Sequence, residues 1–419
     1  MSRERTESVV VIGGGVVGTA CAYYLAQEGW RVTLIERRGY GSGCSHANCG
    51  YVSPSHVLPL AEPGAIQKTL KAMLHPSSPF SIRPRFDPTL WSWLLHFARR
   101  CNTADMLQSA QAIHALLESS RQLYPQLIEQ HHLACEWQTI GLLFVFESLK
   151  GFDKYSHTND LLADKFDVPA QPLRGSQLTD FEPALKPGLA GAWYYPNDAH
   201  LRPDRLLSSW RKVLERIGVV IKEQCELESF VAEGGRVRAV KTSAGELAAD
   251  QFVLATGALT PRFAQQLGCR IPIQPGKGYS ITMPRPDRCP KYPMIFSERK
   301  VAITPMNSGY RIGSTMEFAG YDESISAQRL QLLTDAARDY LFDPYVEPFE
   351  ERWYGWRPMT YDSVPIIDYS PRLPNVLIAA GHNMLGLSMA TGTGRLVSEM
   401  LSGHRPHIDR QPYRVGRFG

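Results

Sequence analysis

The stretch Val9-Val-Val-Ile-Gly-Gly-Gly-Val-Val-Gly18 decides the fold of this chain. Its first four residues are apolar, which is typical of a strand buried on both faces of a sheet. Its glycines at 13, 15 and 18 have G-x-G-x-x-G spacing, and a helix is predicted over 19–27. A second strand is predicted over 31–35, and Glu36 stands at its end. This order of strand, glycines, helix, strand and acid predicts a dinucleotide-binding βαβ unit.

Each part of this unit has a physical role toward a dinucleotide. Gly13 permits the tight turn after the strand, and Gly15 lets the backbone approach a pyrophosphate. Gly18 lets the helix pack closely on the strand. The N–H groups at the helix start, near Val16 and Val17, then point at the phosphates. The acid at the end of the second strand can accept hydrogen bonds from both ribose hydroxyls.

The bulk properties limit the class of protein. The chain has 419 residues, which is more than a single hydrophobic core usually holds, so two domains are expected. The net charge of +4 is too small to predict binding to nucleic acid. No apolar run reaches the roughly 18 residues of a membrane-spanning helix. The scattered cysteines predict reduced thiols and no metal site. Because the first apolar segment is the dinucleotide strand, no signal peptide is expected, and the predicted location is cytoplasmic.

The chain returns twice to the first domain, which is therefore predicted to be discontinuous. The first return is a helix from Pro203 to Gly218, a strand over 219–221, a hairpin over 227–242 and a strand over 251–255. That last strand continues into Thr256 and Gly257, an arrangement typical of flavin-binding two-domain enzymes. The second return is a strand over 376–380, a glycine-containing turn and a helix over 388–401.

The remaining segments predict a second domain. Residues 58–87 contain many prolines and are interpreted as an irregular connection, followed by helices over 88–100 and 110–131 and a strand over 140–147. Short β segments over 279–283, 300–304 and 310–314 predict an antiparallel sheet. The fold class expected is a Rossmann-like FAD-binding domain interleaved with an antiparallel-sheet substrate domain. The predicted division assigns 1–84, 201–270 and 361–419 to the first domain, and 85–200 and 271–360 to the second.

Several ordered motifs resemble the FAD-dependent D-amino acid oxidase superfamily, and most closely the bacterial D-amino acid dehydrogenases. The resemblance covers almost the whole chain. Besides Gly13–Gly18 and Glu36-Arg37, it rests on Ser45-His-Ala-Asn-Cys-Gly50 with Val52-Ser-Pro54, Ala61-Glu-Pro-Gly64, Pro196-Asn-Asp198, Pro275-Gly-Lys-Gly-Tyr-Ser280, Trp353-Tyr-Gly-Trp-Arg-Pro-Met-Thr360, and Gly381-His382 through Gly394-Arg395.

The resemblance implies a non-covalent FAD and removal of a hydride from the α-carbon of an amino acid to flavin N5. The imino acid would hydrolyse to a 2-oxo acid and ammonia, or remain a cyclic imine when the substrate is a proline. The residues expected to bind FAD are Gly13, Gly15, Val16, Val17, Gly18, Glu36, Arg37, Ser45, His46, Asn48, Gly50, Leu227, Thr256, Gly257, Gly381, Leu385, Gly386, Leu387 and Ser388.

The chain also departs from the dehydrogenases that it resembles. They usually have Gly-His-Gly-Thr-Leu-Gly-Trp-Thr where this chain has Gly381-His-Asn-Met-Leu-Gly-Leu-Ser388. They usually have an aromatic residue at the place of His56, and Thr-Gly-Leu-Arg-Pro at the place of Tyr354-Gly-Trp-Arg-Pro358. Oxidation of D-proline or cis-4-hydroxy-D-proline therefore remains an alternative.

The predicted catalytic residues are Arg357, Tyr279, Tyr354, His382 and His56. A guanidinium fork matches a carboxylate with two parallel hydrogen bonds, so Arg357 is the first candidate for holding the substrate; the alternative is a structural pair with Asp362 or Asp368. The tyrosines are candidate phenol donors to the carboxylate, lids over the substrate, or ordinary half-buried packing residues. His382 and His56 are candidate polar contacts to flavin or substrate, or core histidines. No general base is assigned.

Other functions and partners stay open at this level. An oxidase of the same fold would pass electrons to oxygen, whereas a dehydrogenase would use a quinone or another carrier. A flavoprotein sensor or assembly subunit is the non-enzymatic alternative. The segment Trp91–Phe97 could contact a quinone or the inner face of a membrane, although its helical spacing favours a buried face. The sequence does not predict the oligomeric state.

Overall fold

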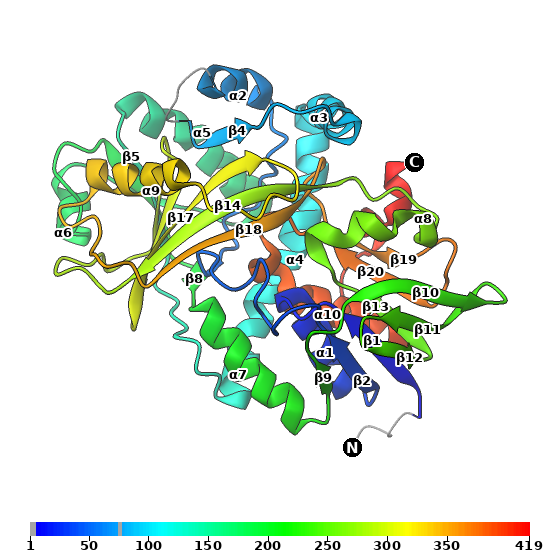
Figure 1. Cartoon of the computed structure of the whole chain (residues 1–419). Coiled ribbons are helices and arrows are strands. Elements are labelled where there is room, and N and C mark those ends of the chain that lie inside the picture. Colours follow the sequence, from blue (N-terminus) through cyan, green and yellow to red (C-terminus); the bar gives the residue numbers. More distant parts are fainter. Residues whose placement is uncertain (1–5, 74–77) are drawn as a thin grey trace.

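The computed structural model describes residues 6–73 and 78–419, and its two large sheets lie side by side (Figure 1). The first sheet has six strands in the order β19-β20-β13-β1-β2-β9. All neighbours in it are parallel except β19, which runs antiparallel to β20. Its strands are β1 (Ser8–Ile12), β2 (Arg31–Ile35), β9 (Val220–Lys222), β13 (Gln251–Leu254), β19 (Ile366–Tyr369) and β20 (Val376–Ala380).

Strand β1 is buried on both faces, as its apolar sequence predicts. Val9 and Val11 join the core formed with helices α1 (Val16–Gln27), α4 (Thr103–His131) and α10 (Gly386–Ser402). Val10 and Ile12 join a second core beneath a three-stranded sheet. That sheet is β10 (Leu227–Glu233), β11 (Arg236–Thr242) and β12 (Gly245–Ala248), so the predicted hairpin gains a third strand.

The second sheet has nine strands, in the order β18-β14-β17-β16-β15-β5-β7-β6 with β4 paired to β17. Most neighbours are antiparallel, but β15 pairs parallel with β5 and β17 pairs parallel with β4. Its strands are β4 (Phe80–Ile82), β5 (Leu142–Phe146), β6 (Gln171–Leu173), β7 (Gly191–Tyr195), β14 (Ile273–Met283), β15 (Met294–Phe296), β16 (Val301–Met306), β17 (Gly309–Phe318) and β18 (Glu351–Thr360).

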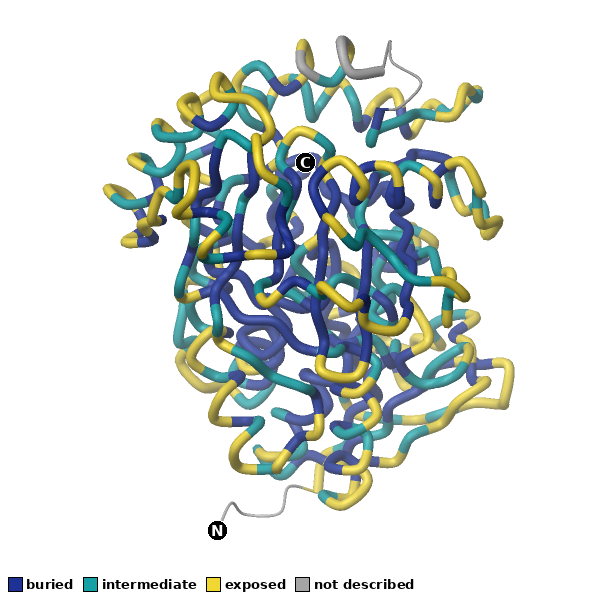
Figure 2. Tube along the Cα trace, turned by 90° about the vertical axis from the view of Figure 1, so that its left-hand side faces the viewer, coloured by how far each residue is buried: buried dark blue, intermediate teal, exposed yellow. Residues whose placement is uncertain are grey.

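The other elements cover and connect these sheets. Figure 2 shows buried residues along the middle of the molecule and exposed residues at its turns. The elements are β3 (Tyr51–Val52), which pairs with β8 (Ala199–His200), and the helices α2 (Ala65–Met73), α3 (Pro88–Arg100), α5 (Leu149–Phe166), α6 (Ser176–Phe181), α7 (Pro203–Arg216), α8 (Ala264–Leu267) and α9 (Ala327–Tyr340), with 3₁₀ turns at Gly257–Phe263, Gln411–Tyr413 and Val415–Phe418.

The structure corrects some expected boundaries. The interpretation of 58–87 as irregular is wrong, because this segment contains α2 and β4. Helix α4 begins at Thr103 rather than near 110, since Asn102 accepts a hydrogen bond from the N–H of Asp105 as its cap. Strand β4 belongs to the nine-stranded sheet. The predicted division of the chain into domains remains a prediction.

Helices α1 and α10 pack in direct backbone contact. A methyl group at Gly394 would lie 2.6 Å from the carbonyl carbon of Ala20. We therefore expect Gly394→Ala to lower the free energy of unfolding by about 1–3 kcal/mol, because the two helices must separate. Gly416→Ala is the control, since a methyl group there has no neighbour within 4 Å. Urea unfolding measures both variants, and equal stabilities would contradict the packing argument.

Candidate functional site

A cavity of about 1540 Å³ lies where the two sheets meet. Its volume exceeds the roughly 300–1,000 Å³ of an ordinary small-molecule pocket, so it has room for a large ligand and a second, smaller one. Most of the sequence-predicted residues line this cavity. They are Gly13, Gly15, Val16, Val17, Glu36, Arg37, Ser45, Asn48, Gly50, His56, Leu227, Thr256, Gly257, Tyr279, Tyr354, Arg357, His382, Leu385, Gly386, Leu387 and Ser388.

Two positions, one in the turn after β1 and one in the first turn of α1, have no space for any side chain. Gly13 has a φ of +112°, and a methyl group there would lie 2.4 Å from the carbonyl oxygen of Ala255. A methyl group at Gly18 would lie 1.8 Å from the carbonyl oxygen of Gly13. Gly18 is outside the cavity lining, and this contact gives it the packing role that the sequence predicts. The turn therefore holds the start of α1 against the sheet.

The start of α1 faces the cavity without a side-chain cap from its own N-cap residue, Gly15. The N–H of Val16 donates to Ser45 Oγ over 3.0 Å. Free N–H groups and the positive end of the helix dipole make such a terminus a binding site for anions. The start of α10 repeats this arrangement, because Leu385, Gly386 and Leu387 also line the cavity.

Glu36 stands at the end of β2 with its carboxylate on the cavity wall. Its Oε2 accepts a hydrogen bond from the N–H of Gly14 over 2.8 Å, and its Oε1 accepts one from the N–H of Arg38 over 3.1 Å. These bonds fix the carboxylate beside the glycine turn. Both oxygens keep unused lone pairs, as the predicted contact with ribose hydroxyls requires.

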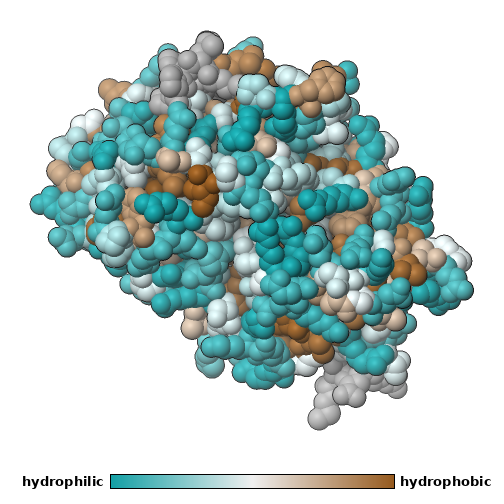
Figure 3. Space-filling model, in the orientation of Figure 1, coloured by the Kyte–Doolittle hydropathy of each residue, from teal (hydrophilic) through white to brown (hydrophobic). Residues whose placement is uncertain are grey.

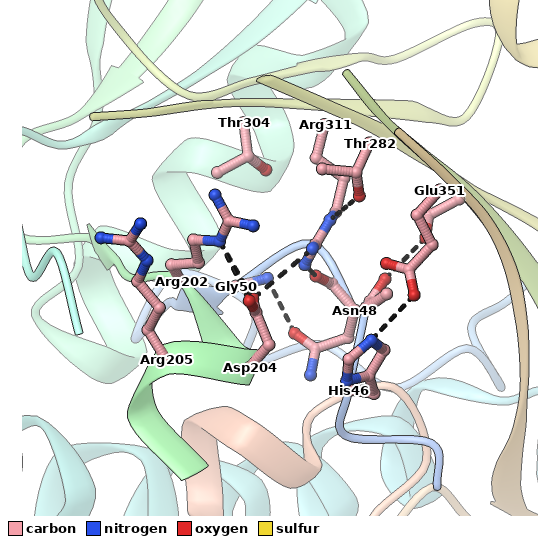
Figure 4. Close-up of polar contacts among 12 residues, drawn as sticks. His46, Asn48, Gly50, Arg202, Asp204, Arg205, Thr282, Thr304, Arg311 and Glu351 are labelled. Carbon is pink, nitrogen blue, oxygen red and sulfur yellow. Dashed lines mark hydrogen bonds and ion pairs between the residues drawn. The ribbon is translucent and has the colours of Figure 1, made fainter. Parts of the chain in front are cut away.

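The loop over 45–50 forms the wall between the two sheets. Three successive carbonyl oxygens in it, those of Ala47, Asn48 and Cys49, accept hydrogen bonds from side chains of the nine-stranded sheet. The donors are Ser280 Oγ over 2.7 Å, Arg311 Nη1 over 2.8 Å and Thr304 Oγ1 over 2.6 Å, on β14, β17 and β16. Figure 4 shows the bond from Arg311 to Asn48. These bonds hold the loop where its residues line the cavity.

Besides Gly18, two predicted cofactor residues, His46 and Gly381, are outside the cavity lining. The ring of His46 points toward β18, where its Nε2 lies 2.8 Å from Glu351 Oε1 (Figure 4). Gly381 has a φ of +81°, and a methyl group there would lie 2.7 Å from Thr360 Cγ2. Both residues therefore hold the backbone near the cavity but do not line it themselves.

Arg357 on β18 presents its guanidinium to the cavity. Nη1 donates to the carbonyl oxygen of Thr315 over 2.5 Å. Loss of hydration lowers its pKa from the usual range, and the nearby thiols of Cys44 and Cys49 oppose this shift. Within residues 6–73 and 78–419, no carboxylate lies within ion-pair distance of it; Asp362, the alternative partner, pairs with Arg417 instead. The site therefore contains a cation without a fixed counterion.

The two predicted tyrosines line the cavity from the face of the strands opposite Arg357, and their catalytic role remains a prediction. On β14, Gly276 and Gly278 share the face of Arg357, so Tyr279 and its register partner Tyr354 lie on the opposite face. Tyr279 is 1% exposed, and its hydroxyl donates to Glu317 Oε2 over 2.7 Å. Contact of this hydroxyl with a carboxylate held by Arg357 is therefore disfavoured.

Lys277 shares that opposite face. Its Nζ lies 2.9 Å from Asp322 Oδ2 and 4.9 Å from the ring centre of Tyr354. It is fully buried and outside the cavity lining, so it is neither a surface lysine nor a cavity group.

The two cavity histidines are neutral near pH 7. Burial lowers the pKa of His382 to about 3, and its Nε2 lies 3.0 Å from Thr393 Oγ1. Burial and the charge of Lys300 lower the pKa of His56 to about 4. His382 is thus a satisfied buried histidine at the cavity wall, whereas His56 lies against the ring of Phe144 at a centroid distance of 5.4 Å.

Gly278 and Thr315 were missed by the sequence analysis. A methyl group at Gly278 would lie 2.4 Å from Arg357 Cζ, so the absent side chain makes room for the guanidinium. Glycines at alternate positions, 276 and 278, inside a strand are the signal that could have indicated this close approach. Thr315 gives no such signal, since its contribution is a backbone carbonyl.

The chain has detectable relatives over nearly its whole length. A family model described as FAD dependent oxidoreductase (DAO) matches residues 8–400. The D-amino acid dehydrogenase of Agrobacterium fabrum is 32% identical over 417 residues, covering 98% of this chain and 99% of that protein. That of Granulibacter bethesdensis is 34% identical over 422 residues, with coverage of 98% and 99%. This chain belongs to the FAD dependent oxidoreductase family.

Solved structures of other flavoenzymes share the fold of this family member. Glycine oxidase from Geobacillus kaustophilus has a TM-score of 0.79 at 21% identity, covering 98% of both chains. L-proline dehydrogenase from P. horikoshii has a TM-score of 0.75 at 21% identity, covering 99% of both. The predicted fold class is confirmed.

The residues present fit the FAD that the family requires. The glycine turn leaves no room for side chains, the start of α1 has no side-chain cap from its N-cap residue, and Glu36 stands beside the turn. These are the groups that a diphosphate and a ribose need. The start of α10 supplies a second helix terminus at the same cavity.

We expect Glu36→Gln to raise the dissociation constant of FAD about 10- to 100-fold, because a hydrogen bond to a charged group contributes about 1.5–3 kcal/mol. Glu233→Gln is the control, since Glu233 is exposed on the far hairpin. Ultrafiltration followed by flavin fluorescence measures retention. Equal retention in both variants would remove Glu36 from the ribose-binding role.

Proposed function

We propose that this protein is a dehydrogenase that oxidises D-amino acids, with Arg357 binding the substrate carboxylate. The observation that carries the proposal is a cavity-facing guanidinium that has no carboxylate partner among the described residues. A partly desolvated cation is costly unless a ligand supplies the opposite charge. The names of the bacterial relatives, D-amino acid dehydrogenases, support this substrate class.

The protein groups would bind and orient the substrate. Arg357 would fix the carboxylate through two parallel hydrogen bonds, and Gly278 leaves the space in which the guanidinium lies. The sequence-predicted cofactor residues that line the cavity would hold FAD; Gly18, His46 and Gly381 would shape the surrounding backbone. Bound FAD would supply the acceptor for a hydride from the substrate α-carbon. His382 is neutral, so it adds no charge beside the substrate.

A cyclic substrate is the alternative within the same chemistry. His56 lines the cavity at a position where the related dehydrogenases usually have an aromatic residue. One structural neighbour, from P. horikoshii, is an L-proline dehydrogenase. Anaerobic bleaching of the bound flavin by a panel of D- and L-amino acids, with proline and cis-4-hydroxy-D-proline included, discriminates these substrates.

We expect Arg357→Ala to retain FAD but lower kcat/KM about 10²–10³-fold, because truncating one partner of a buried charge pair costs about 2–5 kcal/mol. Arg357→Lys keeps the charge but loses the planar guanidinium, so its kcat/KM should lie between those of the unmodified enzyme and Arg357→Ala. Arg174→Ala, which removes an exposed ion pair with Asp153, is the control. Steady-state kinetics with D-alanine measures the effect. If Arg357→Ala had a kcat/KM close to that of the control, Arg357 would not be the carboxylate-binding residue.

The electron acceptor would be a quinone or another carrier, with oxygen as the alternative for an oxidase; peroxide release separates the two. We propose that α2 and α3 contact a membrane surface. Helix α3 buries Leu90 and Trp93, as its spacing predicts, but exposes Trp91 and Leu95 by 58% and 54%. Apolar side chains lie at the surface around α2 and α3, at the top of Figure 3.

The charge and position of this surface support a lipid partner. Arg99 and Arg100 end α3. Arg100 pairs with Asp105, and Arg99 lies one helical turn after Leu95, where it would meet anionic headgroups. Trp91 and Leu70 also line the cavity, so its wall reaches this surface. Within residues 6–73 and 78–419, every helix is too short or too polar to cross a bilayer.

We expect the double variant Trp91→Ser, Leu95→Ser to lose most of its binding to vesicles of phosphatidylglycerol and phosphatidylethanolamine. The two side chains lie one helical turn apart and would insert together. Leu149→Ser is the control, because Leu149 is 63% exposed on α5. Vesicle flotation measures binding. Failure of the unmodified protein to float, or equal flotation of all variants, would reject a membrane contact at α3.

A further inference from the structure

A buried chain of polar groups connects His56 at the cavity to a carboxyl group inside the protein. Ser55 Oγ lies 3.5 Å from His56 Nδ1 and donates to Asp198 Oδ2 over 2.5 Å. The N–H of Ser55 also donates to Asp198 Oδ1, over 3.1 Å. Ser55 and Asp198 are 4% and 1% exposed, and only His56 of the three lines the cavity.

The direction of these bonds determines the state of the imidazole. Because the Ser55 hydroxyl hydrogen points to Asp198, Ser55 Oγ offers a lone pair to His56, and Nδ1 must carry the hydrogen. Nε2 then carries a lone pair. No group among the described residues is hydrogen-bonded to Nε2, so it is free to accept a hydrogen bond from a ligand.

We propose that His56, Ser55 and Asp198 take the proton that the substrate ammonium group must lose before hydride transfer. This inference rests on the proposed oxidation of amino acids. The ammonium proton passes to His56 Nε2, the Nδ1 hydrogen passes to Ser55 Oγ, and the Ser55 hydrogen passes to Asp198 Oδ2. The products are a neutral amine, a neutral imidazole and a protonated carboxyl group, and no electrons move. His56 is the group that touches substrate; Ser55 and Asp198 act through it.

The electrostatics around the chain suit this transfer. Burial raises the pKa of Asp198 to about 7, although hydrogen bonds from Ser55 oppose the shift, so its carboxylate can take up one proton near neutral pH. The low pKa of His56 favours passing the proton onward over holding it. The pH dependence follows from this pKa. The three residues can accept a proton while Asp198 is ionised, and they lose this capacity as the pH falls through about 7.

Other titratable groups pack around His56, Ser55 and Asp198. The hydroxyls of Tyr155 on α5 and Tyr195 on β7 lie 3.0 Å apart, and burial raises the pKa of both, so they remain neutral. The charge of Lys300, before β16, acts on His56, and that of Glu62 acts on Tyr155. Neither Tyr155 nor Tyr195 is part of the chain of bonds to the cavity.

The first test is anaerobic reduction of the bound flavin by D-alanine between pH 6 and 9. In the unmodified enzyme the limiting rate should rise through about pH 7 and level off. Flavin reduction in Asp198→Asn and Ser55→Ala should be about 100-fold slower at pH 7. Their rates should keep rising toward alkaline pH, because substrate that is already deprotonated in solution needs no proton acceptor in the protein. Ser55→Thr keeps the hydroxyl and should restore the unmodified profile.

Two measurements separate this role from a structural one. Acetate binding, read from the flavin spectrum, should be unchanged in Asp198→Asn and Ser55→Ala, because acetate has no proton to transfer. Infrared difference spectra between pH 6 and 8 should show a protonated carboxyl band that is absent in Asp198→Asn. That band needs no turnover.

The outcomes discriminate the two proposals. If no D-amino acid bleaches the unmodified enzyme, the proposed function fails, and the infrared titration still tests Asp198. If the unmodified enzyme is bleached while Asp198→Asn and Ser55→Ala keep its rates and pH profile, the proton transfer is wrong and the function stands. Absence of a titrating Asp198 band would also overturn the transfer.

Discussion

The three carbonyl groups at 47–49 are the constraint on which the cavity depends. A loop buried between two sheets cannot leave its backbone oxygens without donors, because each unpaired group costs about 1–3 kcal/mol. Ser280, Arg311 and Thr304 supply those donors from three neighbouring strands. Arg311 is 1% exposed and lies 3.6 Å from Asp204 at the start of α7, so the same arginine connects the loop to the six-stranded sheet side. The position of the loop relative to the glycine turn follows from these bonds.

Because side chains alternate along β14 and β18, the cations of these two strands lie on different faces of the second sheet. Lys277 and Arg357 come from neighbouring strands, yet they lie on opposite faces. Lys277 is neutralised by Asp322, whereas Arg357 has only backbone and thiol neighbours among the described residues. A cation with a resident counterion stabilises the fold, and one without a counterion can bind an acid. This difference, and not the residue type, distinguishes the structural cation from the proposed binding group.

The cavity joins three chemical environments. Helix starts and glycine backbone at one wall suit phosphates, the guanidinium suits a carboxylate, and apolar residues of α2 and α3 reach the outer surface. His56 adds a neutral acceptor connected to a buried carboxyl group. Binding of a dinucleotide and binding of an amino acid are thus compatible within one cavity.

Local patterns in the sequence determined a large part of the fold. The apolar run at 9–12, the glycine spacing and the acid at 36 predicted the βαβ unit, because each depends on neighbours within about 30 residues. The strands over 31–35 and 376–380 and the helix over 88–100 match the structure. Helix α2 was missed because the prolines around it obscured a short amphipathic segment.

Only the tertiary structure decided which side chains meet in the cavity. The motif at 353–360 predicted that Arg357 and Tyr354 would share a site, and both line the cavity, although they project from opposite faces of β18. The partners of the carbonyls at 47–49 lie more than 230 residues away, and Asp198 lies 143 residues from Ser55. The sequence by itself determined the dinucleotide unit and the residue types available for chemistry. Only the folded chain brings these residues together in one cavity. Strand register and long-range hydrogen bonds cannot be recognised from a local sequence pattern.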